Sequence, residues 1–428
     1  MTTPSSDVVD FRSANPHALE TILAASETRT IIAARDIVDL KGVKLWARDQ
    51  PVSRALQERL LDRGLKEPLE TSLRAKDGLN HERLARELAA RMNGPLAALL
   101  QPAAAALMAA LPSVPLHPVA QLLLTAAQDA RPVAFAHAVD AMAVAGAMAL
   151  ARRAPAVVVT GAMTAGLLHD IGEIYMSPDF GEADIGATLD ADQYRQLVVH
   201  PHIGQLLLSQ LTDTRPDVVR AVAEHHERLD GSGFPRCLQG TALSPLGCLV
   251  AAAEAALLAL REPGASLQHA SVALRVVPGE FDEHMVGPLV AAARRAAAGQ
   301  PLPAPTRLRD DLTRLDLALQ SALNHLDALA PDAEALGDGD TGQHAIVRAT
   351  VLARHLLLRL RAGWNESGLW SPAALDGEAA AEAGAVQDAL RWRLRAIERA
   401  ARLAAGPVQG EAADTLDEVC AGLAGELG

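Results

Sequence analysis

The chain has 428 residues, and 39 Lys and Arg against 52 Asp and Glu give it a formal charge of −13 at pH 7. This acidic balance argues against a general nucleic-acid binder, which needs a basic face to neutralise phosphates, so we expect neither DNA nor RNA as a partner. Hydrophobic residues make up 50 % of the chain and aromatic residues only 3 %. This profile favours an Ala- and Leu-rich, mainly α protein over a β-sandwich.

Features of secretion and membrane insertion are missing from the sequence. Three cysteines are too few and too scattered for a disulfide framework or a Cys-based zinc site. The first ten residues lack the charged and apolar regions of a signal peptide. Since every apolar run of about 18 residues is interrupted by a charged residue or a histidine, we expect no membrane span. The chain is therefore expected to be cytoplasmic.

Residues 1–95 are predicted to form a small α+β N-terminal module. Two short apolar runs, 30–34 and 43–46, flank a segment that ends in the turn-like pair Lys41–Gly42, and this pattern predicts a hairpin. Leucines at helical spacing between Pro51 and Met92 predict helices after it. From its position alone, we expect this module to regulate the chain or to recruit a partner.

Two helical parts are expected to follow. Residues 96–300 are strongly helical and rich in Ala and Leu, and the Pro-rich run 299–305 reads as a linker. In 306–428, leucines recur at helical spacing, which predicts a C-terminal helical bundle. This bundle is a candidate for forming a homodimer. Its histidines, His325, His344 and His355, are interpreted as ordinary helix residues because no carboxylate or Cys pattern accompanies them.

Side chains able to bind a metal recur through the middle part at intervals of 25 to 32 residues, each about one helix plus a connection. They fall into five groups: His137, His169–Asp170, His200, His225–His226 and Glu254. Imidazoles and carboxylates together suit divalent Fe, Mn or Zn. We therefore expect five helices to direct these groups toward a common centre.

The two adjacent pairs favour more than one ion. Neighbouring residues on a helix diverge by about 100°, so His225 and His226 would reach two ions more readily than one. Asp170, with two oxygens, is placed to bridge them. Because seven candidate ligands exceed what one tetrahedral site needs, the sequence predicts a centre with two divalent ions.

The motifs in this stretch resemble those of the HD-GYP subgroup of HD-domain metal-dependent phosphohydrolases. HDIGEIYM (169–176) and HHERLDGSGFPRCLQG (225–240) are similar to the two signature segments of that subgroup, and HPHIG (200–204) is similar to the His motif between them. PLGCLVAAAE (245–254) resembles the segment that ends in the last acidic ligand, and His137 falls where the family has its first histidine. The resemblance covers residues 130–262.

This resemblance implies an HD-domain-type helical bundle with two, sometimes three, ions, commonly iron or manganese. These ions activate a hydroxide that attacks the phosphodiester of cyclic di-GMP. The implied catalytic pair is His169 and Asp170. The implied substrate is a cyclic dinucleotide or another phosphoester. The residues implied to contact it are Gly233, Phe234, Pro235, Arg236 and Glu173.

Departures from the family pattern concern phosphate recognition more than metal binding. Glu173 stands where the family usually has Lys, and Cys248 where it usually has Arg, so two cations are lost. Phe234 replaces a Tyr and Glu254 replaces an Asp, while Val133 stands where some members have the Glu of a third ion. No lysine follows Lys76, so only an arginine can compensate. The candidates are Arg228, Arg236 and Arg261.

These departures leave a second hypothesis open. A degenerate signalling module of bacterial type would keep the fold and the metals but act by binding a nucleotide or a protein without turnover. Under either hypothesis, the loop 230–235 is expected to line the mouth of the site or to contact a signalling protein. Within the second motif, Glu227 is predicted to orient a ligand histidine or to lie in solvent, and Asp230 to do the same or to cap the turn.

Overall fold

The computed structural model describes most of the chain. The described residues are 11, 13–60, 63–178, 196–261, 265–297, 305–329, 341–367, 389–390, 393–394, 396–398, 400–402, 404–406 and 408–424. The contacts divide the chain into two compact units, one with Met1–Leu189 and Gln196–Glu254, the other with Asp190–Arg195 and Ala255–Gly428. The first unit thus combines the expected N-terminal module with the ligand-bearing part of the expected middle domain. The division of the chain into three separate domains, 1–95, 96–300 and 306–428, stays a prediction.

The first unit begins with short helices and strands. They are α1 (Pro16–Ser26), β1 (Ile31–Ala33), β2 (Ile37–Val38), β3 (Lys44–Trp46), α2 (Arg54–Leu60), α3 (Leu69–Ser72) and β4 (Leu73–Ala75). Asn15 caps α1, because its Oδ1 accepts from the N–H groups of His17 and Ala18, and Pro16 fills the first helical position. The small α+β arrangement expected from the sequence is present.

The expected hairpin with its turn at Lys41–Gly42 is present, but its first strand is not the apolar run 30–34. β1 pairs antiparallel with β4, so that Ile31 lies opposite Ala75, whereas β3 pairs with β2, so that Ile37 lies opposite Trp46. The real hairpin is therefore β2–β3, and its turn is fixed by Asp39, whose Oδ1 accepts from the N–H groups of Lys41 and Val43. β1 takes a partner about 40 residues further along the chain.

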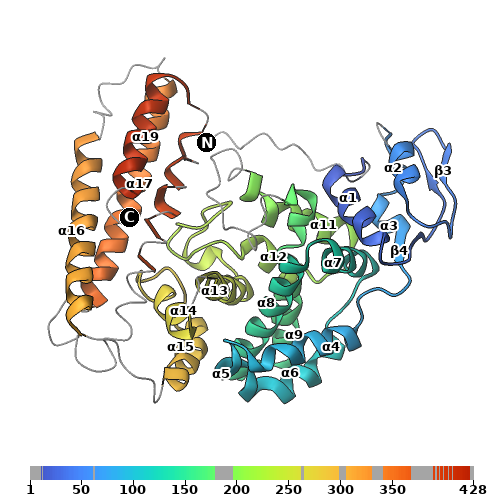
Figure 1. Cartoon of the computed structure of the whole chain (residues 1–428), viewed down its shortest axis with the longest axis horizontal. Helices are drawn as coiled ribbons and strands as arrows, with labels where there is room; N and C mark the ends of the chain where they lie inside the picture. Colours follow the sequence, from blue (N-terminus) through green and yellow to red (C-terminus); the bar gives the residue numbers. More distant parts are fainter. Residues whose placement is uncertain are drawn as a thin grey trace. The chain divides into compact units, whose positions relative to one another are not determined.

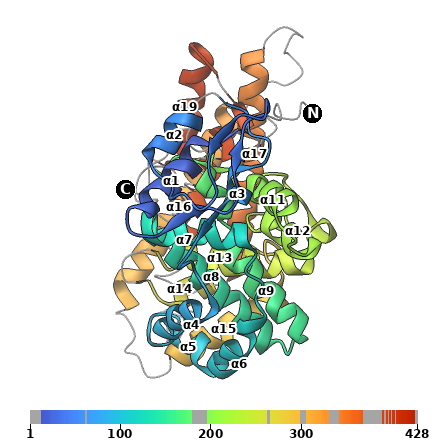
Figure 2. The same ribbon diagram turned by 90° about the vertical axis from the view of Figure 1, so that its right-hand side faces the viewer.

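The described residues that follow in the first unit are mainly helical, and short 3-10 helices lie between some of the longer elements. Among these helices are α4 (His81–Ala90), α5 (Ala97–Leu100), α6 (Ala104–Ala110), α7 (Pro118–Ala130), α8 (Pro132–Ala151), α9 (Ala156–Leu168), the 3-10 helix η4 (Ile171–Tyr175), α11 (His200–Leu211), α12 (Pro216–Glu224) and the start of α13 (Pro245–Ala259). α8 lies beside both α7 and α9 (Figures 1 and 2). Small residues allow this approach, since a Cβ on Gly166 would lie 2.5 Å from the carbonyl oxygen of Ala141.

α8 and α9 are apolar around almost their whole circumference because neighbours cover them on most sides. By length and composition, Pro132–Ala151 and Ala156–Tyr175 are apolar enough to cross a membrane. However, 72 % and 83 % of their most apolar windows are buried inside the structure. Packing within the first unit accounts for their composition.

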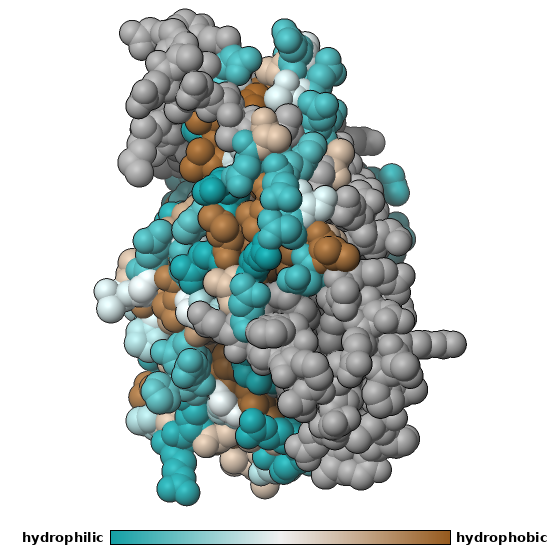
Figure 3. Space-filling view, turned by 90° about the vertical axis from the view of Figure 1, so that its left-hand side faces the viewer, coloured by the Kyte–Doolittle hydropathy of each residue, from teal (hydrophilic) through white to brown (hydrophobic). Residues whose placement is uncertain are grey.

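The second unit is also helical. It contains the end of α13, α14 (Leu267–Ala273), α15 (Glu283–Ala297), α16 (Pro305–Leu329), α17 (Thr341–Ser367) and α19 (Glu411–Ala424). One apolar core joins α14, α16, α17 and α19, which confirms the expected C-terminal helical bundle. Hydrophobic side chains lie among hydrophilic ones on the face shown in Figure 3, and Leu317, Val351 and Leu358 are exposed. Most of the expected linker at 299–305 lies outside the described residues.

Candidate metal centre

All seven predicted ligands lie in the first unit and are buried. His137 is in α8, His169 ends α9, Asp170 directly precedes η4, and His200 begins α11. The remaining three, on or directly after α12 and α13, are His225, His226 and Glu254. Each is less than 10 % exposed. The structure thus brings together the five separated groups, as the spacing in the sequence predicts.

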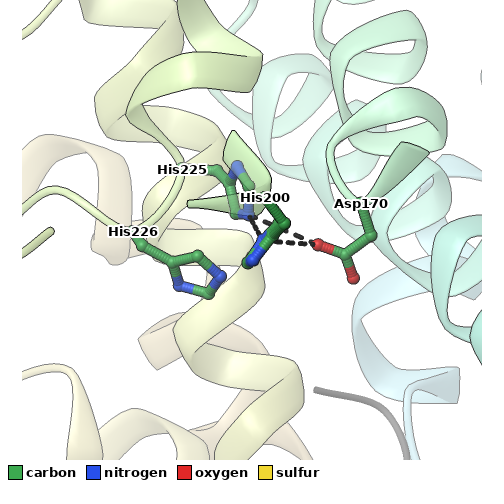
Figure 4. Close-up of side chains that lie close together, drawn as sticks. All are labelled: Asp170, His200, His225 and His226. Atoms are coloured by element: carbon green, nitrogen blue, oxygen red, sulfur yellow. Dashed lines mark hydrogen bonds and ion pairs between the residues drawn. The ribbon is translucent and has the colours of Figure 1, made fainter. Parts of the chain in front are cut away.

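The seven side chains form two neighbouring groups. Within each group, one ligand atom of every residue lies within 4.8 Å of those of the others. One group contains Asp170, His200, His225 and His226, which Figure 4 shows with the imidazoles gathered on one side of the Asp170 carboxylate. The other contains His137, His169 and Glu254. Two groups of three and four N and O ligands have the composition of two sites for divalent cations.

Asp170 faces both groups with different oxygens. Its Oδ1 lies 3.3 Å from Nε2 of His200 and 3.3 Å from Nε2 of His225. Its Oδ2 lies 3.0 Å from Nε2 of His169 and 3.6 Å from Nε2 of His137. Glu254 closes the second group, since its Oε2 lies 2.8 Å from Nε2 of His137 and 3.1 Å from Nε2 of His169. Asp170 therefore lies between the two groups and presents one oxygen to each.

Backbone carbonyls orient three of the imidazoles in the same way. Nδ1 of His169, His200 and His225 lies 2.7, 2.6 and 2.6 Å from the carbonyl oxygen three residues earlier. A carbonyl oxygen only accepts hydrogen bonds, so Nδ1 carries the proton and Nε2 is left to bind a cation. This arrangement is typical of metal-ligating histidines.

The distances between the inward nitrogens fit ligands that share an ion. Nε2 of His200 and Nε2 of His225 lie 3.0 Å apart, and those of His137 and His169 lie 3.2 Å apart. Two nitrogens bound about 2.1 Å from one cation can be at most about 4.2 Å apart, so both pairs are close enough to share an ion. Both oxygens of Asp170 face Nε2 atoms of these histidines. A pair of divalent cations therefore suits this set of residues.

Burial and charge set the protonation states of the ligands. Burial lowers the pKa of His225 to about 4 and that of His226 well below its usual value. Burial alone would raise the pKa values of Asp170 and Glu254, but the neighbouring histidines hold both well below their usual range. Near pH 7 these four groups thus have the forms that bind divalent cations, neutral imidazole and carboxylate.

His169 differs from the other ligand histidines. Burial lowers its pKa, but Asp170 and Glu254 beside it outweigh burial and hold the pKa well above the usual value. A cation bound at Nε2 would have to displace a proton from this ring.

Close backbone contacts set the spacing of the ligand-bearing elements. A Cβ on Gly172 would lie 2.1 Å from the carbonyl oxygen of His200, so only glycine allows η4 to pack this tightly against α11. Likewise, a Cβ on Gly233 would lie 2.4 Å from the carbonyl oxygen of His226. These glycines of the two motifs allow the close approaches that position Asp170, His200 and His226.

The residues predicted at the substrate lie around the loop that follows α12. Gly233 is buried, the ring of Phe234 stacks on that of His226 with centroids 4.5 Å apart, and Pro235 is half-buried. Arg236 is exposed, and its side chain donates to Oε1 of Gln205 in α11. Phe234 thus covers a ligand ring, and Arg236 is an exposed cation of this loop.

Two other residues of the second motif also hold this loop. Glu227 accepts from the N–H groups of Arg236 and Leu238, at 2.7 and 2.9 Å, so the prediction that it orients a ligand histidine or lies in solvent is wrong. Asp230 accepts from the N–H and hydroxyl groups of Ser232, which confirms the predicted turn cap.

Glu173 is buried in η4, with 3 % exposure, and belongs to neither ligand group. Among the arginines named as compensating cations, Arg228 is buried and donates to the carbonyl oxygens of His225 and Glu227. Arg261 lies in the second unit. The replaced residue Cys248 is half-buried in α13.

Sequence reasoning missed several residues that support the centre. Glu224, just before His225, accepts from the N–H and hydroxyl groups of Ser244 and so joins the end of α12 to the start of α13. Arg131 donates to the carbonyl oxygens of Glu173 and Met176 and so holds η4. These residues lack a motif of their own, because their partners are backbone atoms or lie far away in the sequence.

Comparisons with known proteins agree with this geometry. Residues 121–276 match the HD domain family. The 3′3′-cGAMP-specific phosphodiesterase 3 of Vibrio cholerae is 31 % identical over 90 residues, which are 21 % of this chain and 19 % of that protein. A cyclic di-GMP phosphodiesterase of Pseudomonas aeruginosa is 33 % identical over 123 residues, 29 % of each protein. The chain spans less than a third of the length of these relatives. Residues 121–276, which contain both ligand groups, are an HD domain.

Proposed function

We propose that this chain is a metal-dependent phosphohydrolase of the HD-GYP subgroup that hydrolyses a cyclic dinucleotide, either cyclic di-GMP or a related phosphodiester. The observation that carries this proposal is the position of Asp170, one oxygen toward His200 and His225 and the other toward His137 and His169. A carboxylate between two groups of imidazoles is the arrangement of a two-metal hydrolase. Two curated relatives that cleave cyclic dinucleotides support the class of substrate.

The donor set supports two divalent ions, iron or manganese before zinc. Six of the seven ligands would be divided between the two sites, with Asp170 shared. Mixed imidazole and carboxylate ligands without thiolates suit these metals. When bound, such a pair lowers the pKa of a water molecule and neutralises charge on the phosphoryl group.

The protein's own residues would orient both the ligands and the substrate. The carbonyl oxygens that accept from Nδ1 hold His169, His200 and His225 with Nε2 inward. Phe234 fixes the plane of His226 by stacking. Arg236, exposed on the same loop, is the cation that we assign to a substrate phosphate in the absence of the family's lysine.

A second candidate rests on Glu173 and Cys248, which replace two cations of the family. With fewer positive charges near the ions, a phosphodiester would bind less tightly, and the domain would act by binding rather than turnover. This alternative predicts the same metal content as the hydrolase, and only turnover separates the two.

The test combines metal analysis with turnover. The wild type, purified without added metal, and the variants Asp170→Asn and His202→Ala are assayed for bound metal and for hydrolysis of cyclic di-GMP and 3′3′-cGAMP. His202 is exposed two residues after His200 and belongs to neither ligand group, so it serves as the matched control. We expect two ions and turnover in the wild type and in His202→Ala, and at least about a 100-fold loss of turnover in Asp170→Asn. Two ions without turnover would favour the binding module, whereas turnover that survives Asp170→Asn would refute the mechanism.

A further inference from the structure

The 3-10 helix η4 begins directly after Asp170, so its placement determines where the shared carboxylate points. The N–H of Glu173 donates to the carbonyl oxygen of Asp170 at 2.9 Å, which ties the first turn of η4 to that residue. On one side, Gly172 brings η4 against the backbone of His200 in α11. A shift of η4 would therefore move Asp170 relative to both ligand groups.

Further contacts of η4 come from the N-terminal residues of the chain. The hydroxyl of Tyr175, the last residue of η4, donates to Oε1 of Glu70 in α3 at 2.6 Å. Nδ2 of Asn15, the cap of α1, donates to the carbonyl oxygen of Tyr175 at 3.1 Å. The ring of Phe11 meets the Tyr175 ring edge-on, with centroids 5.7 Å apart. Three separate residues before position 76 thus hold one residue of η4.

The bond between Tyr175 and Glu70 is well protected. Tyr175 is 5 % exposed and Glu70 is 3 % exposed. Burying a carboxyl group is costly unless its partners satisfy it, and burial raises the pKa of Glu70. Among the described residues, Glu70 forms a side-chain hydrogen bond with one other residue, Tyr175. A buried carboxyl group whose single side-chain partner is Tyr175 indicates that Glu70 holds the Tyr175 ring in place.

Arg131 adds a second connection. Its guanidinium donates to the carbonyl oxygens of Glu173 and Met176, at 2.8 and 3.0 Å, and its Nε donates to the hydroxyl of Thr21 in α1 at 3.2 Å. The same arginine thus contacts both η4 and the N-terminal module. Together with Tyr175, it links the module to the segment that carries Asp170.

We propose that the N-terminal module is a structural part of the metal centre, and that Tyr175, held by Glu70 and Asn15, is a positioning residue for Asp170. The module would act on the centre through η4, without itself contacting an ion or the substrate. This inference rests on the proposed metal centre but not on turnover.

The test measures the affinity of the full-length, metal-stripped protein for Mn²⁺ by competition with a chelating dye. Tyr175→Phe removes only the hydroxyl, and Asn15→Asp keeps the Oδ1 that caps α1 but loses the Nδ2 donor. Glu70→Gln keeps an oxygen that accepts from Tyr175. We expect Tyr175→Phe and Asn15→Asp to weaken binding of at least one ion by about 10-fold and Glu70→Gln to bind like the wild type.

The control variant is Arg29→Gln, which breaks the ion pair between Arg29 in the N-terminal module and Asp129 in α7, neither of which forms a hydrogen bond with η4. It is expected to lower the unfolding temperature and to leave the affinity for Mn²⁺ unchanged. If Tyr175→Phe lowers the unfolding temperature as Arg29→Gln does and binds Mn²⁺ as tightly as the wild type, the contact serves only stability and the proposal is overturned. Should Tyr175→Phe fail to fold, Asn15→Asp decides by the same criterion. If the wild type binds two ions but hydrolyses neither dinucleotide, the proposed hydrolase function is refuted. The comparison of Mn²⁺ affinities among these variants still tests the role of Tyr175.

Discussion

The ring of Phe234 stacks on the ring of His226, with centroids 4.5 Å apart and planes inclined by 22°. This contact gives the aromatic residue of the second motif a role on the metal side of the centre. The resemblance had implied a role at the substrate. Stacking on His226 and contact with a substrate both need an aromatic ring. Only the stacking does not depend on the hydroxyl that the family's tyrosine carries.

Replacement of Phe234 separates these roles. We expect Phe234→Ala to weaken metal binding by about 10-fold, because the plane of His226 is no longer fixed. Phe234→Tyr keeps the ring and is expected to bind metal like the wild type. Metal content and KM, measured on the same preparations, check this. A rise in KM alone for Phe234→Ala, at unchanged metal content, would return Phe234 to the substrate.

Gly172 permits the contact between η4 and α11, and a methyl group cannot be accommodated there. Gly172→Ala places a carbon 2.1 Å from the carbonyl oxygen of His200, so α11 must move away from Asp170. We expect a loss of about 1–3 kcal/mol in the free energy of unfolding and at least a 10-fold loss of metal affinity. Urea unfolding and metal titration measure both quantities.

Gly287, inside helix α15 with nothing within 4 Å of a Cβ, provides the matched control. Gly287→Ala is expected to change the free energy of unfolding by less than about 1 kcal/mol, because the helix preference of alanine is opposed by Pro288, which disfavours the helical conformation of a preceding residue that carries a Cβ. Its metal affinity should not change. Equal metal affinities in Gly172→Ala and Gly287→Ala would show that the packing of η4 on α11 does not set the position of Asp170.

The helical fold and the set of seven clustered residues could be predicted because their signals are local. Histidine pairs and carboxylates recur at the spacing of one helix plus a connection, and the apolar pattern of each helix is readable in a short window. The pairing of β1 with β4 could not be found in this way, because the partners are about 40 residues apart and the nearer segment 43–46 offered a plausible alternative.

The role of Glu227 could not be predicted for a related reason. Its carboxylate accepts from the N–H groups of Arg236 and Leu238, and backbone donors carry no mark in the sequence. Tyr175 and Glu70 are likewise 105 residues apart and bond through side chains that are common in proteins. Residues that bind ions could be anticipated from their chemistry, whereas the residues that hold them in place depended on the folded chain.

The ion pair between Arg29 and Asp129 makes a pH-dependent contribution to stability. Hydrogen bonding from Arg29 is the main cause that lowers the pKa of Asp129 below its value of 3.8 in an unfolded chain. The native state therefore binds fewer protons than the unfolded state in the window just below pH 3.8, so the contribution is present above that pH and is lost as the pH falls. We expect the difference in unfolding temperature between the wild type and Arg29→Gln to be constant above pH 5 and to shrink below pH 4. A difference that is as large at pH 3 as at pH 6 would mean that the charge of Asp129 is not its source.

Replacement of Glu254 by aspartate, the residue usual in the family at this position, is expected to weaken metal binding in this protein. Oε2 of Glu254 lies 2.8 Å from Nε2 of His137 and 3.1 Å from Nε2 of His169. Glu254→Asp shortens the side chain by one carbon–carbon bond, about 1.5 Å, so that from the present position of α13 the carboxylate would no longer reach both histidines. We therefore expect Glu254→Asp to lose at least about 10-fold in affinity for the ion of the His137–His169 group, and the other ion to remain bound.

A titration that resolves two Mn²⁺-binding steps would measure this difference in affinity. Glu283→Asp, at an exposed position of α15, controls for a general effect of shortening a glutamate. A selective loss of one ion in Glu254→Asp would show that the two groups bind their ions separately and that the extra methylene matches the spacing of α13 from α8 and α9. Full occupancy of both sites in Glu254→Asp would instead mean that the backbone around the centre adapts to the shorter ligand, and that the positions of His137 and His169 do not require a glutamate.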